Sequence, residues 1–288
     1  MKLARGFTGR KYVCRPKNHP FYSYDDWFIA TTPTDNGIPE AERNLSLTFR
    51  YNDLSSLENL FDENGDEIAC VIMEAATAVE PENGFLKAVQ TLCRRKGAVF
   101  VIDEMITGFR WHLNGAQTYF GIEPDLSTFG KGIANGFSVS ALVGRRDIMK
   151  LGGIHHDQKR VFLISTTHGA ENHGLAALRA TLATFQEEAV IEHLWAVGQQ
   201  LVDGLNDVAA EVGIDSAFRA FGFPCSPYFD CKDADGVASL PLRTLFLQEM
   251  VKNGVIANYL APSFSHGDRE IEMTLEAARK SLRVYARA

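Results

Sequence analysis

The sequence predicts an α/β fold built on a mostly parallel sheet. Two short apolar runs, at residues 68–73 and 99–102, have the length of buried strands. Between them, residues 84–97 place apolar side chains at helical spacing and are bounded by Gly84 and Gly97. A strand, a helix and a second strand in succession form a βαβ unit, which makes the two strands parallel. Continuous apolar runs fit such a sheet, because both of its faces are covered.

The remaining elements follow in order from the same patterns. Residues 1–40 are polar and rich in turns. A short apolar stretch leads to Lys131, and later segments alternate between strand and helix patterns. We predict strands at 138–144 and 161–165, and helices at 145–151, 172–185, 190–212 and 268–285. Between the last two helices we predict short strands within 218–230 and at 255–259, and a helix at 242–254.

After the long helix predicted at 190–212, the pattern changes to short strands and single helices, which indicates two domains. We predict a large domain at residues 1–189 and a small one at residues 190–288, and a chain of 288 residues is long enough for both.

Composition excludes several classes of function. Hydrophobic residues make up 45% and charged residues 23%, as in ordinary globular proteins. The net charge of −7 argues against a nucleic-acid partner, which selects a basic face. No apolar run approaches the roughly 18 residues of a membrane span, and the N-terminus lacks the apolar core of a signal peptide. Five cysteines without CxxC spacing are typical of free thiols, so we expect no zinc site and a cytoplasmic location.

An acid and a lysine mark a candidate site. Asp103 ends the second apolar run, and Lys131 follows 28 residues later between Gly130 and Gly132. Ligands of open α/β sheets bind at the carboxyl ends of the strands, where the two side chains would face one pocket. Lysine amines form Schiff bases with pyridoxal phosphate, and the ring nitrogen of that cofactor needs an anionic partner. A bland alternative stays open, because acids after strands often cap helices and lysines in glycine loops are often solvated.

Two other interpretations are weaker. A phosphate loop requires Ser or Thr after the lysine, and Gly132 stands there instead. The cluster His155, His156 and Asp157 and the pair His168 and His173 contain metal-ligating residue types. However, His168 and His173 are five residues apart and do not share a helix face, so we predict no metal.

The motifs around the acid and the lysine closely resemble those of the class III pyridoxal-phosphate aminotransferases, most of all the branch of glutamate-1-semialdehyde aminomutase. The resemblance spans almost the whole chain. It is carried by DEMITGFR at 103–110, GAQ at 115–117, PDL at 124–126, GKGIANG at 130–136 and GRRD at 144–147. It implies the fold-type-I architecture, with an incomplete large domain and a small C-terminal α+β domain. It also implies pyridoxal phosphate as cofactor.

The resemblance further implies roles for particular residues. Lys131 would carry the cofactor as a Schiff base and move the substrate proton, and Asp103 would pair with the pyridine nitrogen. Met105, where the family usually has Val, would pack on one face of the ring. Glu74 matches a glutamate near the phenolic oxygen of the cofactor, although the proline that follows in the family is Ala75 here.

Two further contacts are implied with alternatives. The aromatic residue on the other ring face is Phe21, or Tyr22 if the alignment slips by one. The threonine that reaches the phosphate of the partner subunit's cofactor is Thr166, or Thr167 as the second choice. Because such sites are shared between subunits, the resemblance implies a homodimer.

The resemblance also implies an N-terminal truncation. Family members begin well upstream of the position matched by Met1, and their upstream part holds a Gly-Ser turn whose N–H groups bind the phosphate. The reaction implied is amino-group transfer between small-molecule donors and acceptors, or an intramolecular shift as in the aminomutase. The alternatives are a non-catalytic or split fragment of such an enzyme and another pyridoxal-phosphate enzyme, a lyase or racemase.

Overall fold

The computed structural model describes residues 1–19, 23–161, 167, 169 and 171–288. It divides the chain into two compact units, Met1–Thr184 and Phe185–Ala288. Among the described residues, no helix combines the length and the apolar character that crossing a membrane requires.

The first unit is an α/β domain. Its strands are β1 Tyr12–Pro16, β2 Ser46–Phe49, β3 Ile68–Glu74, β4 Val99–Asp103, β5 Leu126–Phe129 and β6 Ala141–Gly144. Its helices include α1 Lys2–Thr8, α2 Asp26–Ile29, α3 Glu40–Arg43, α4 Leu54–Asn64, α5 Phe85–Lys96, α6 Ala116–Tyr119 and α7 Arg146–Met149. The 3₁₀ turns are η1 Gly65–Glu67, η2 Lys131–Ala134 and η3 Lys150–Gly152. Helix α8, Asn172–Glu187, runs across the division between the units.

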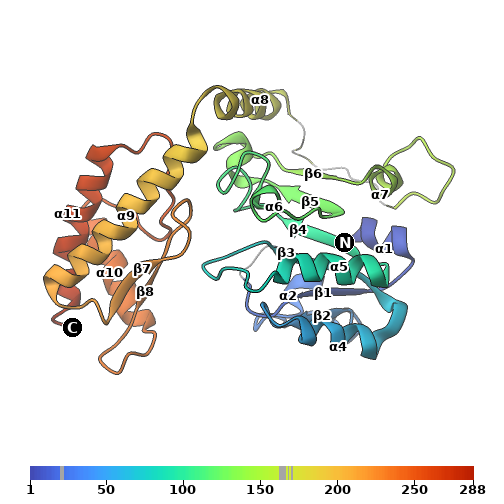
Figure 1. The fold of residues 1–288 in the computed structure, drawn as a ribbon, viewed down its shortest axis with the longest axis horizontal. Helices are drawn as coiled ribbons and strands as arrows, with labels where there is room; N and C mark the ends of the chain where they lie inside the picture. The colour runs from blue at the N-terminus through green and yellow to red at the C-terminus, as the bar shows by residue number, and fades with distance from the viewer. Residues whose placement is uncertain (20–22, 162–166, 168, 170) are drawn as a thin grey trace. The chain divides into compact units, whose positions relative to one another are not determined.

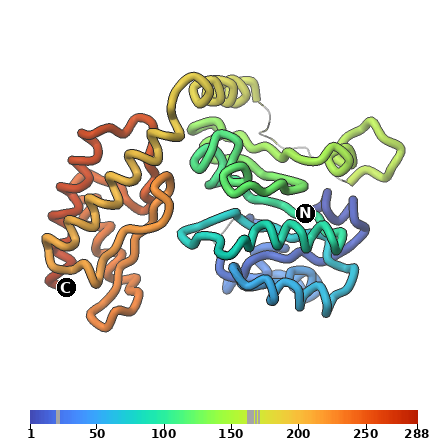
Figure 2. Tube along the Cα trace, viewed as in Figure 1, coloured from blue at the N-terminus to red at the C-terminus, as the bar shows by residue number. Residues whose placement is uncertain are grey.

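The six strands form one sheet in the order β2-β1-β3-β4-β5-β6, so the first strand of the chain lies inside the sheet beside later ones (Figure 2). All neighbouring pairs are parallel except β5 and β6, which are antiparallel. The prediction of an α/β fold with a mostly parallel sheet is confirmed. The carboxyl ends of β1, β3, β4 and β5 therefore meet at one edge of the sheet.

Helices cover both faces of this sheet (Figure 1). On one face, Leu3 of α1 and Ile148 of α7 pack with sheet residues such as Cys70 and Val101 in a single apolar cluster. On the other face α5 runs along the strands, buries Val89 and Cys93, and ends at Gly97 in the left-handed conformation. Glycine reaches that conformation without the steric cost that a Cβ imposes.

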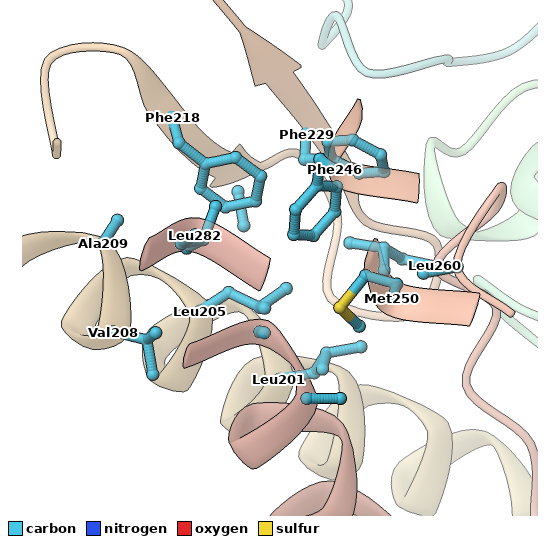
Figure 3. Packing of buried hydrophobic residues seen from close by; sticks show 14 of the residues in the cluster. Leu201, Leu205, Val208, Ala209, Phe218, Phe229, Phe246, Met250, Leu260 and Leu282 are labelled. Atoms are coloured by element: carbon cyan, nitrogen blue, oxygen red, sulfur yellow. The ribbon is translucent and has the colours of Figure 1, made fainter. Parts of the chain in front are cut away.

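The second unit is a small α+β domain. It consists of α9 Val190–Val212, β7 Phe218–Phe221, β8 Tyr228–Cys231, α10 Leu240–Lys252 and α11 Asp268–Tyr285. The two strands form an antiparallel ribbon whose inward side chains meet the helices. Phe218 lies with its ring centroid 4.9 Å from that of Phe246 and 5.7 Å from that of Phe229 (Figure 3). Burial of these aromatic side chains, together with the aliphatic residues packed around them, stabilises the domain.

Several details differ from the predictions. Residues 255–259, predicted as a strand, form no regular structure, because no neighbouring strand is available to pair with them among the described residues. The opening of the chain, predicted as polar turns, contains helix α1 and strand β1. Strand β6 begins at Ala141, three residues later than predicted. Residues 162–165 of the strand predicted at 161–165 lie outside the described part of the chain.

Candidate functional site

Two carboxylic acids stand side by side at the carboxyl edge of the sheet. Glu74 ends β3 and Asp103 ends β4, and the two residues are paired in the strand register. Both side chains are buried, with 3% of each residue exposed. Residues opposite each other in parallel strands project to the same face. The strand register thus brings two buried acids together at the edge where such sheets bind ligands.

Glu74 is the more strongly perturbed of the two. Burial, reinforced by the charge of neighbouring Asp103, raises the pKa of Glu74 to about 8. Its Oε2 atom is buried and has no hydrogen-bond partner among the described residues. Glu74 is therefore protonated near neutral pH, and it presents an oxygen whose hydrogen-bonding capacity is unused. A buried polar atom in this state is a place where a ligand recovers a lost hydrogen bond.

Asp103 is held in one orientation by its own loop. Burial raises the pKa of its carboxyl, while the N–H of Met105 and the charge of Lys131 act in the opposite direction. The Met105 N–H donates to Asp103 Oδ1 over 2.8 Å. Lys131 and Met105 thus favour the anionic form that burial opposes, and the carboxylate is fixed at the end of its strand.

Lys131 lies just beyond the end of the adjacent strand. Asp103 pairs in register with Thr128 of β5, and Lys131 follows the last residue of β5, Phe129, by one intervening glycine. The lysine side chain is exposed and forms no ion pair within the described part of the chain. Its backbone has φ of 46°, in the left-handed region. That conformation is costly for a side chain of this kind, and such strain gathers at functional sites.

Met105, which follows the end of β4, lies against the backbone that follows the end of β5. A Cβ on Gly130 would overlap the Cε atom of Met105, so the methionine side chain lies directly against the backbone next to Lys131. Only glycine fits at position 130 without displacing Met105. The apolar thioether is half-buried and forms one wall of the site.

The next residue, Glu104, organises the loop after β4, a role that the sequence analysis missed. Glu104 is 1% exposed, and its carboxylate accepts hydrogen bonds from the N–H groups of Ala116 at 3.0 Å and Gln117 at 2.9 Å. The Thr107 hydroxyl donates to the same carboxylate. A Cβ on Gly115, whose φ is +88°, would lie 2.5 Å from Glu104 Oε1. No periodic pattern in the sequence signals this contact, because Ala116 lies 12 residues beyond Glu104.

The structure thus brings together four of the predicted site residues: Glu74, Asp103, Met105 and Lys131. Thr167 is described and exposed, and nothing in its described surroundings connects it to the other four. Three further candidates, Phe21, Tyr22 and Thr166, lie outside the described residues. The described residues contain no group of three His, Cys, Asp or Glu side chains suited to a metal ion.

One described cavity lies elsewhere. It has a volume of about 310 Å³ and is lined at the start of β4 and β5 by Val99, Asp125 and Arg145, among others. These residues lie at the amino end of the strands, and none of the four site residues lines it. Arg145 is already paired with Asp125 at 2.7 Å. We therefore place the site by its chemistry at the carboxyl edge and not by cavity size.

The residues present fit pyridoxal phosphate. A free primary amine matches its aldehyde, a buried carboxylate matches its pyridine N–H, and Met105 offers an apolar surface to a ring. The unpartnered Oε2 of Glu74 is an available hydrogen-bonding position at the same edge.

Comparisons with known proteins agree with this chemistry. The model of the family Aminotransferase class-III matches residues 1–280. The chain is 34% identical over 306 residues to a glutamate-1-semialdehyde 2,1-aminomutase of Syntrophobacter fumaroxidans, covering 96% of this chain and 68% of the relative. It is 30% identical over 293 residues to a 3-aminobutyryl-CoA aminotransferase of Cloacimonas acidaminovorans, covering 98% of this chain and 67% of the relative.

Solved structures show the same fold. The FumI protein of Sphingopyxis sp., in its PLP internal aldimine form, superposes with a TM-score of 0.86 at 26% identity, covering 100% of this chain and 68% of that one. A glutamate-1-semialdehyde aminomutase of Pseudomonas aeruginosa in complex with PMP has a TM-score of 0.82 at 19% identity, covering 98% of this chain and 68% of that one. At that identity the second likeness concerns the fold alone.

Proposed function

This chain belongs to the class-III aminotransferase family, and from that premise we propose that it transfers amino groups by means of a Schiff base on Lys131. It is a pyridoxal-phosphate-dependent enzyme. The observation that carries the assignment of Lys131 is its place beside Asp103 at the ends of two adjacent parallel strands. The strained backbone of Lys131 supports it further.

Each residue of the site has a distinct task in this proposal. When bound, pyridoxal phosphate supplies a ring that withdraws electrons from the α-carbon of the substrate. Asp103 would accept the hydrogen bond of the ring nitrogen and would keep that nitrogen protonated. Lys131 would hold the cofactor through Nζ, and its amine would carry the proton between the substrate α-carbon and C4′ of the cofactor. Met105 packs on the ring and excludes water from that face.

Glu74 completes the assignment. Because its carboxyl is protonated near neutral pH, it donates a hydrogen bond instead of repelling a neighbouring oxygen of the ring. Phe21 or Tyr22 is proposed for the opposite ring face, and Thr166 or Thr167 for the phosphate of the partner subunit's cofactor. These assignments rest on the resemblance of the sequence motifs.

Labelling of the lysine tests the proposal. We expect the full chain to turn yellow with pyridoxal phosphate, and borohydride reduction to leave a covalent mass increment on the peptide that contains Lys131. Lys131→Ala removes both signals, because no amine remains at that position. Lys87→Ala, at an exposed lysine of α5, is the matched control and keeps both. A label on other lysines with Lys131 unmodified would contradict the assignment, and no colour at all would favour a non-catalytic fragment.

Product analysis separates the possible reactions. Transfer of a labelled amino group to a keto acid or aldehyde identifies a transaminase, whereas retention of the label in a rearranged product identifies an aminomutase. Loss of the amino group or of a carboxyl group, without transfer, would instead identify a lyase, and inversion of the α-carbon a racemase.

Two properties of the whole protein are proposed on the same basis. We infer a homodimer, because the family's sites are shared between subunits, and a location in the cytoplasm. Sedimentation of the full chain tests the first, and a single species of monomer mass would refute it.

A further inference from the structure

A histidine that the proposed mechanism does not use lies at the same edge of the sheet. Strand β1 ends at Pro16, and its register with β3 pairs Cys14 with Val71. A turn at Lys17 and Asn18 follows, and His19 comes three residues after the last residue of the strand. Since β1 and β3 are parallel, His19 emerges on the side of the sheet where Glu74, Asp103 and Lys131 lie.

The imidazole of His19 is fixed but unsatisfied. His19 is 9% exposed, and neither ring nitrogen has a hydrogen-bond partner among the described residues. Its ring centroid lies 4.7 Å from that of Tyr51. Tyr51 is itself held, because its hydroxyl donates to the carbonyl of Ala75, the residue after Glu74, over 2.6 Å. A ligand oxygen at that position would supply the hydrogen bond that the buried ring nitrogen lacks.

The positive charge near His19 favours a ligand with an anionic oxygen. Arg15 is 2% exposed, and its guanidinium donates to the Thr31 hydroxyl at 2.6 Å and to the Pro16 carbonyl at 2.8 Å, both neutral groups. No carboxylate of the described residues pairs with it. Glu74, protonated near neutral pH, does not balance this charge either. A buried guanidinium without an anion favours an anionic ligand.

The protonation state of His19 agrees with this assignment. Burial, together with the nearby charge of Arg15, lowers the pKa of His19 to about 4. At neutral pH the ring is therefore uncharged, with one nitrogen donating and the other accepting. Arg15 supplies the charge, and the imidazole supplies a directed N–H group.

We propose that His19 binds substrate, donating a hydrogen bond from its imidazole N–H to a carboxylate of the amino donor or acceptor, with buried Arg15 balancing the charge. The inference rests on the proposed function and deepens it: the preferred substrates are amino acids and keto acids, and simple amines and aldehydes are poorer. His19 is a specificity-determining residue at the end of β1, and its contact is separate from those assigned to Lys131 and Asp103.

Paired substrates test the contact. With 4-aminobutyrate and butylamine as matched donors, His19→Phe keeps a ring against Tyr51 but has no N–H. We expect the KM for 4-aminobutyrate to rise about tenfold or more, as for loss of a hydrogen bond to a charged group, while the KM for butylamine stays within about twofold. His19→Gln, which retains an N–H donor, recovers most of the loss. The control His193→Gln alters a histidine of α9 in the second unit and leaves both constants unchanged.

Equal changes of KM for the two donors, or no change for either, would overturn the proposal. If the chain shows no cofactor label on Lys131, the proposed function fails. Binding of a carboxylate by His19 is then tested separately, in the chain without cofactor. In the full chain with ¹⁵N-labelled histidine, sodium butyrate is expected to shift the ring resonances of His19 in a saturable way, and butylamine is not. Resonances of His19 that ignore butyrate would refute the contact in that case.

Discussion

Replacement of Glu74 by glutamine is expected to stabilise the chain in a pH-dependent way. The folded protein holds the pKa of this carboxyl near 8, mainly through burial, whereas the ordinary value is 4.5. Above that ordinary value the unfolded chain has lost the proton and the folded chain still binds it. Stability then falls as pH rises, by about 1.4 kcal/mol per pH unit, until the folded carboxyl itself ionises.

The size of the effect follows from this interval. Glutamine carries no charge, so the stability of the variant does not fall with rising pH through this residue. The difference in unfolding free energy between Glu74→Gln and the parent should be close to zero near about pH 4.5 and reach on the order of 3 kcal/mol near pH 7. It should level off above about pH 8, where both states of the parent are ionised.

Urea unfolding of the cofactor-free chain across this pH range measures the difference. Glu63→Gln, at an exposed position of α4, is the matched control, and its stability should run parallel to that of the parent. A Glu74→Gln curve that is also parallel to the parent would show that Glu74 ionises normally in the folded chain. The donor role proposed for its protonated carboxyl would then be wrong.

Three other substitutions probe the site, the loop after β4 and the core of the second unit. Asp103→Asn should keep the cofactor label on the lysine but lower kcat by about 100-fold or more, because a neutral amide no longer holds the ring nitrogen protonated; an unchanged kcat would refute the role. Gly115→Ala should destabilise the chain by about 2–4 kcal/mol in urea unfolding, since its Cβ meets the buried Glu104 carboxylate, whereas Gly121→Ala has open space and should cost only about 1 kcal/mol. Similar costs at the two glycines would contradict the clash. Phe246→Ala should cost about 3–5 kcal/mol by the same measurement, because the side chain is 1% exposed and packs between two other rings; a cost below about 1 kcal/mol would mean that the second core repacks.

The sequence was most informative where one pattern repeats over a whole element. The buried runs at β3 and β4 and the amphipathic α5 appear in the structure within a residue or two of prediction. Asp103 and Lys131 were predicted as site residues because each stands where an apolar run ends, and the structure places both at the carboxyl ends of neighbouring strands. Family motifs then added Glu74 and Met105, which chemistry alone would not have singled out.

Other features depend on contacts that periodicity does not encode. Strand β2 has four residues and only one of them, Phe49, is fully buried, so it shows no apolar run. Helix α4 carried a readable signal in Asp53, which accepts from the Ser56 N–H at 3.1 Å as its N-cap, and this signal was overlooked. The roles of Glu104 and His19 arise from partners, or from missing partners, far along the chain. Such relations become visible only when the strands are placed beside one another.

The left-handed backbone at Lys131 has a consequence for how this position changes over evolutionary time. Glycine would occupy that backbone more easily than lysine, so selection for stability alone drives the lysine out. In the proposed function, the demand for the Lys131 amine opposes that drift. Relatives that gave up the chemistry should therefore lose this lysine early, with glycine among the common replacements. Retention of lysine at this position in a related chain then becomes a record of continued selection for activity.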